Sequence, residues 1–198
     1  MRANANRSLH LSVILTVVAA AVVVGLSTAR AAVVSYQVDL NGANESPPNV
    51  SPATGTGQVD VDATAHTMRV RVNFSGLLGT TTACHIHAPT ASALTGTAGV
   101  ATTTPYFAGF PIGVMSGSYD NTLDMTQASS YNAPFITNNG GTTATAEAAL
   151  FQFIADGKAY LNIHSTSYGG GEIRGFLVPL VVTPTNQSTW GRIKTLYR

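Results

Sequence analysis

Short runs in which apolar and polar side chains alternate are the feature that most restricts how this chain can fold. The clearest run is 67–74, where the sequence TMRVRVNF places an apolar residue at every second position. Successive side chains of a β-strand point to opposite faces of the sheet, so one face of this run would be buried and the other solvated. Such alternation is typical of half-buried antiparallel strands.

Similar segments recur along the chain, separated by Gly, Pro, Asn, Ser and Thr. The predicted strands are 35–40, 55–62, 67–74, 83–88, 99–103, 113–119, 159–164 and 172–180. Because strands do not alternate with helices, we expect an all-β, two-sheet antiparallel sandwich rather than an α/β fold. One short helix is predicted over 146–156, with Thr145 as its N-cap. The segments 88–97 and 126–143 are predicted to be long loops.

The first 31 residues have the pattern of an export signal. Arg2 and Arg7 precede an apolar run at 11–26, and Ala-Arg-Ala at 29–31 supplies the small-x-small pattern of a cleavage site. We therefore expect cleavage after Ala31 and a secreted, periplasmic or cell-surface location. The run is shorter than the ~20 residues that span a bilayer core, so an uncleaved membrane anchor is the less favoured alternative.

Loss of this signal would leave an acidic chain. Three of the ten Lys and Arg residues precede residue 32, so seven would remain against nine Asp and Glu. Three of those seven, Arg192, Lys194 and Arg198, lie in the last seven residues. Nucleic-acid binding needs a clustered basic surface, so nucleic acid is not expected as a partner.

The predicted organisation is a signal at 1–31, a β-domain at 32–180 and a linker with a tail at 181–198. In the tail, Trp190, Ile193, Leu196 and Tyr197 fall on one helical face. A segment this short needs a partner surface to become ordered, because isolated helices require ~12–15 residues. Two interpretations stay open, a disordered or weakly docked tail and a sorting or partner-binding peptide.

Six sequence blocks, in this order, resemble the CHRD domain, a module named after chordin that also occurs in exported bacterial proteins. The blocks are LNGANESPP at 40–48, TGTG at 54–57, FSGL at 74–77, HIH at 85–87, AYLNIHS at 159–165 and GEIRGFL at 171–177. The resemblance covers about 36–180. It implies an immunoglobulin-like β-sandwich and a secreted or envelope binding module, with an extracellular or envelope protein or a small ligand as partner. It does not imply an enzyme.

Two of these blocks contain histidines that can meet. His85 and His87 lie two apart on a predicted strand and share a face, about 7 Å apart along the chain. If the faces of three strands converge, His85, His87, His164 and Glu172 form a cluster with Arg174 beside it. Imidazole and carboxylate donors suit zinc or copper(II), so one hypothesis is a metal site with a redox or hydrolytic role.

The same cluster can instead be a buried hydrogen-bonded network. In that alternative Glu172 pairs with Arg174, Asn162 belongs to the network, and the histidines bond to backbone or carboxylate groups. Glu45 begins a rigid Glu-Ser-Pro-Pro segment that either packs at one end of the domain or forms part of a binding edge. Buried polar groups are costly unless satisfied, so both interpretations mark a candidate site.

Other residue patterns argue against common enzyme classes. The chain has no Gly-x-Ser-x-Gly elbow and no phosphate loop, and its acids are too dispersed to name a catalytic pair. Cys84, the only cysteine, cannot form an internal disulfide and is expected to be a buried core residue. His66 lies in a predicted hairpin turn and is expected to be solvated.

Overall fold

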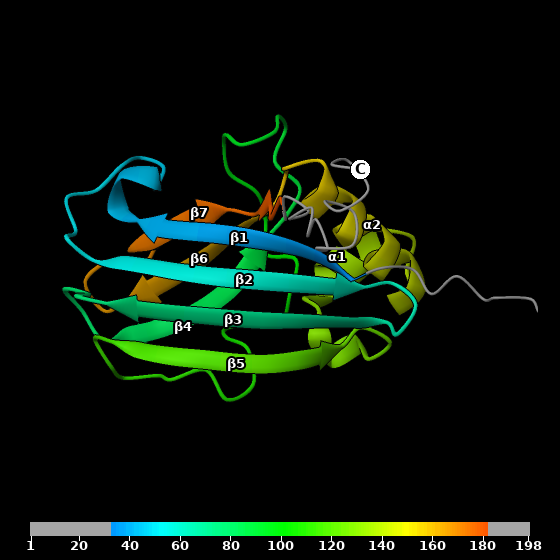
Figure 1. Cartoon of the computed structure of the whole chain (residues 1–198), viewed down its shortest axis with the longest axis horizontal. Coiled ribbons are helices and arrows are strands. Elements are labelled where there is room, and N and C mark those ends of the chain that lie inside the picture. Colours follow the sequence, from blue (N-terminus) through cyan, green and yellow to red (C-terminus); the bar gives the residue numbers. More distant parts are fainter. Residues whose placement is uncertain (1–32, 182–198) are drawn as a thin grey trace, which may run out of the picture.

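The computed structural model describes residues 33–181 as a curved antiparallel sheet with two α-helices at one end (Figure 1). The predicted signal at 1–31 and the tail residues 182–198 lie outside the described residues. Along the sheet the strand order is β4 (Thr81–His87), β6 (Tyr160–Ser165), β7 (Ile173–Phe176), β1 (Val34–Asn41), β2 (Thr54–Asp62), β3 (Thr67–Ser75) and β5 (Gly117–Asp124). The short β8 (Val178–Pro179) also pairs with β1.

This architecture confirms the all-β prediction but not the immunoglobulin-like sandwich. Hydrogen bonding joins all the named strands in one sheet, because β7 pairs with β6 on one side and with β1 on the other. Figure 1 shows that the sheet curves, so that β4 and β6 lie behind the layer of β1, β2, β3 and β5. Two layers of one sheet therefore enclose the core.

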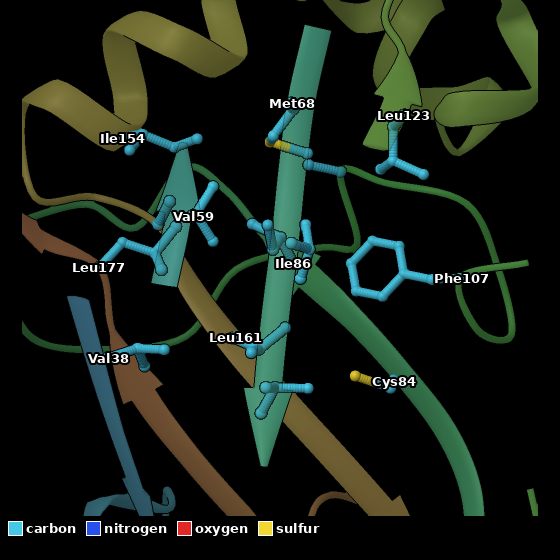
Figure 2. Close-up of a cluster of buried hydrophobic side chains, with 14 of the residues drawn as sticks. Val38, Val59, Met68, Cys84, Ile86, Phe107, Leu123, Ile154, Leu161 and Leu177 are labelled. Carbon is cyan, nitrogen blue, oxygen red and sulfur yellow. The ribbon is translucent and has the colours of Figure 1, made fainter. Parts of the chain in front are cut away.

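The core forms where the apolar faces of these layers meet. Figure 2 shows Ile86 of β4 and Leu161 of β6 in one cluster with Val59 and Met68 from the opposite layer, and all four side chains are fully buried. Phe107, from the loop after β4, closes one side of the cluster. The alternation found in the sequence thus places one face of each strand in a shared interior.

Two predicted strands were placed wrongly. Residues 99–103 form only isolated bridges, because this segment bonds to the edge of β4 through the N–H of Ala101 and the carbonyl of Ile86. The strand predicted at 113–119 begins at Gly117 and continues to Asp124, since the N–H of Gly113 bonds to the Thr81 carbonyl instead of to β3.

The helical content was underpredicted. The predicted loop 126–143 contains a 3₁₀ turn, η2 (Ala128–Ser130), and the short helix α1 (Ala133–Asn138), while a second turn, η1 (Gly42–Asn44), follows β1. Helix α2 (Thr143–Ala155) begins earlier than predicted because Thr142 is its N-cap, and Thr145 completes the capping box. No helix of the described part of the chain is long and apolar enough to cross a membrane.

Gly175 permits the close approach of β7 to β1. A Cβ atom at this position would lie 2.2 Å from the carbonyl oxygen of Asp39. We predict that Gly175→Ala lowers the free energy of unfolding by about 3 kcal/mol, the upper end of overpacking costs, measured by urea denaturation. A Cβ at Gly170 meets nothing within 4 Å, so Gly170→Ala is the matched control. Equal denaturation midpoints for the two variants would contradict this account.

Candidate metal site

The antiparallel pairing of β4 with β6 brings the three histidines of the strands together. Ala83 lies opposite His164 and His85 lies opposite Asn162, so both strands turn their polar side chains to the outer face of the sheet. One ring nitrogen from each of His85, His87 and His164 lies within 4.8 Å of the other two. His85 and His164 are buried, and His87 is half-buried. The site therefore consists of three imidazoles screened from water.

Backbone carbonyls determine which nitrogen of each ring carries the proton. The Nδ1 contacts are His85 to Pro105 O at 3.1 Å, His87 to Ala98 O at 2.8 Å and His164 to Gly169 O at 2.9 Å. A carbonyl oxygen only accepts hydrogen bonds, so each Nδ1 must donate. Each Nε2 of the neutral rings then presents a lone pair. In known metal sites, a hydrogen bond from the ring nitrogen that does not bind the metal orients the histidine in the same way.

The Nε2 lone pairs of His85 and His164 face each other without a donor between them. The Nε2 atoms of His85 and His164 are 3.0 Å apart, and Nε2 of His87 is buried with no hydrogen-bond partner. Two lone pairs at this distance repel unless a proton or a cation lies between them. Two nitrogens bound to one metal ion at ~2.0–2.1 Å are roughly 2.9 Å apart at a right angle and roughly 3.3 Å apart in a tetrahedron. The His85–His164 pair already has this spacing.

Burial keeps these rings neutral at pH 7. Burial, together with the neighbouring His87 and His164, lowers the pKa of His85 to about 3, and burial is the main cause that lowers the pKa of His87 to about 4. Burial also lowers the pKa of His164. Neutral imidazole is the form that binds metals, so protons compete with a cation only in acid.

Glu172 does not join the three histidines. Its carboxylate accepts hydrogen bonds from the Ser51 hydroxyl, the Ser165 hydroxyl and the backbone N–H groups of Leu78 and Gly79. Burial raises its pKa, but these hydrogen bonds outweigh that effect and lower the pKa overall. Glu172 precedes β7. Its carboxylate uses its four hydrogen bonds to connect neighbouring segments of the chain. The structure therefore does not assemble the predicted four-residue ligand set.

Arg174 has Glu45 rather than Glu172 as its ion-pair partner. Its Nε lies 3.8 Å from the nearer carboxylate oxygen of Glu45 and donates to the Asn44 carbonyl, while its guanidinium covers the Tyr160 ring at 4.7 Å. The Tyr160 ring in turn stacks on His87, with the ring centroids 4.7 Å apart. Arg174 thus supports the histidine cluster through an aromatic ring.

Glu45 and Asn162 each bury an oxygen atom without a hydrogen-bond partner. A Cβ atom on Gly171, whose φ is +128°, would lie 2.7 Å from both of these oxygens. Only glycine fits there, and the two acceptors lie close together. Burial raises the pKa of Glu45 to about 7, although Arg174 and the Ser46 N–H partly oppose the shift. Below about pH 7 a protonated Glu45 would carry a donor beside these acceptors, and the ion pair with Arg174 forms as that proton is lost.

Several features of the site had no signal in the sequence. Any residue has a carbonyl oxygen, so the roles of Pro105, Ala98 and Gly169 in orienting the rings could not be read from residue type.

His66 has an exposed side chain, as expected, but its Nδ1 also pairs with the buried Glu147 at 2.9 Å. Cys84 is fully buried in the core, and burial raises the pKa of its thiol.

Replacing Glu45 tests its protonation. Because the pKa of Glu45 is higher in the folded than in the unfolded chain, this group stabilises the fold below about pH 4.5. That stability is lost as the pH rises to about 7, by on the order of 3 kcal/mol. We predict that wild type loses stability relative to Glu45→Gln between pH 4.5 and 8 in urea denaturation. An unchanged difference between the two proteins across this range would refute the assignment.

A comparison with protein-family models matches residues 36–177 to the CHRD domain. The match covers most of the described residues, including all three histidines of the site. No curated protein and no solved structure gives a significant match to the chain.

Proposed function

The chain belongs to the CHRD domain family, and from that premise we propose that it is an exported binding domain whose ligand is a zinc or copper ion. His85, His87 and His164 would hold the ion. The observation that carries the proposal is the convergence of one ring nitrogen from each of three histidines whose rings are oriented by backbone carbonyls. This arrangement favours a metal site over a self-contained network, because a network would need a donor for each of these lone pairs.

The wider role, a secreted or envelope binding module, draws on family membership and on the export signal predicted at 1–31. Its macromolecular partner would be an extracellular or envelope protein, as the acidic composition disfavours nucleic acid. A metal ion at the site would be one ligand of such a module.

The donor set also indicates what chemistry the site can support. Three imidazoles leave at least one coordination position for water or a small external ligand, as in catalytic zinc sites. Glu172 already accepts four hydrogen bonds, so it would not be the fourth ligand. A redox or hydrolytic role would use this open position.

Metal titration tests the proposal directly. We predict that protein stripped with a chelator binds one equivalent of Zn²⁺ or Cu²⁺ in isothermal titration calorimetry, with the stoichiometry checked by elemental analysis. His85→Ala, His87→Ala and His164→Ala each remove a ligand. Each should weaken binding by more than the roughly 10–100-fold that loss of an outer-shell partner costs.

Two variants serve as controls for this titration. His66→Ala removes a histidine outside the cluster, and Glu172→Gln alters a carboxylate whose hydrogen bonds lie elsewhere, so both should retain wild-type affinity. Circular dichroism establishes that each variant is folded. Absence of stoichiometric metal in wild type, or identical titrations for wild type and all three alanine variants, would rule out the metal site.

A further inference from the structure

An open, mostly apolar groove lies between the sheet and helix α2, away from the cluster of His85, His87 and His164; the His66–Glu147 pair also lines it. Val34, Tyr36 and Val61 form its sheet wall, and Ala148, Phe151 and Ala155 form its helix wall, around a volume of about 570 Å³. Val34 is 47% exposed although it begins a strand of the core sheet. Pockets of this size and character bind apolar or aromatic groups.

The described chain ends beside this groove. Strand β8 pairs with β1, and the N–H of Leu180 donates to the Ser35 carbonyl at 2.8 Å. Ser35 lies between Val34 and Tyr36, which both line the groove. The eight residues 182–189 span at most about 26 Å when extended, so the segment that follows them can reach the groove walls.

The segment that follows matches the groove in its apolar side chains and is opposite in charge to the described domain. Residues 190–198 contain Trp190, Ile193, Leu196 and Tyr197 on one helical face, together with three cations. The described residues 33–181 contain four Lys and Arg against nine Asp and Glu. The charge of the tail is therefore opposite in sign to that of the described domain as a whole.

We propose that residues 190–198 of the same chain dock in this groove, with Trp190 and the other apolar side chains against Val34, Tyr36 and Phe151. The surface supplies the partner that so short a segment needs in order to become ordered. Docking covers Val34 and the apolar side of α2. The proposal is independent of the metal site, which lies on the outer face of β4, β6 and β7.

Trp190 is the only tryptophan of the chain and reports docking directly. In the full chain, the docked tryptophan should emit at shorter wavelength than in urea and be protected from acrylamide quenching. Ala148→Lys places a cation in the groove, which repels the cationic segment and cannot be buried against its apolar side chains, so it should shift the emission to longer wavelength with stronger quenching. Ala149→Lys adds the same charge on the same helix outside the groove lining, so its spectrum should match wild type. Leu196→Asp alters only the docking segment and should reproduce the effect of Ala148→Lys without perturbing the domain.

The outcomes separate the possible occupants. Emission and quenching that do not change with protein concentration support docking within one chain. A dependence on concentration would show a second copy as the occupant, and a change on removal of residues 1–31 would show that the N-terminal segment competes; either overturns the proposal. It is also overturned if wild type, Ala148→Lys and Leu196→Asp have the same emission and quenching.

Discussion

The pairing of β4 with β6 is the constraint on which both the core and the histidine site depend. Cys84 and Ile86 of β4 enter the core together with Leu161 of β6, which leaves His85 and His164 on the outer face. A slip of one residue would exchange the faces and place imidazoles in the core. The burial of these apolar side chains therefore holds the register that brings the histidines together.

The outer face of β4, β6 and β7 is unusual because it is polar and yet buried. Every residue of β6 is buried, including Asn162 and His164. Three of the buried side-chain atoms that lack a hydrogen-bond partner among the described residues lie on or beside this face, in His87, Asn162 and Glu45. Such atoms are rare in folded proteins because each costs on the order of 1–3 kcal/mol. Their concentration in one place is the feature on which the proposal of a binding site at this face rests.

The sequence was sufficient to predict strands that depend on local alternation of apolar and polar residues. It was not sufficient to predict features that depend on tertiary contacts. The period-2 pattern predicted β2, β3, β4 and β6 and the faces of His85 and His164, because inner and outer side chains differ in hydropathy. It misplaced the segment 99–103, which is ordered by the edge of β4 rather than by its own pattern. The same parity argument placed Glu172 with the histidines, but hydroxyl and N–H donors far away in sequence draw its carboxylate elsewhere.

The loops, which looked least regular in the sequence, set the chemistry of the histidines. Pro105, Ala98 and Gly169 all lie outside the regular strands, and each orients one ring through its carbonyl oxygen. Rings held in this way lose little rotational freedom when they bind a cation, so less of the binding free energy is spent on ordering them. The strands bring the imidazoles to one place, and the loops choose the nitrogen that each one presents. A change in these loops can thus retune the site while the core and the strand register stay intact.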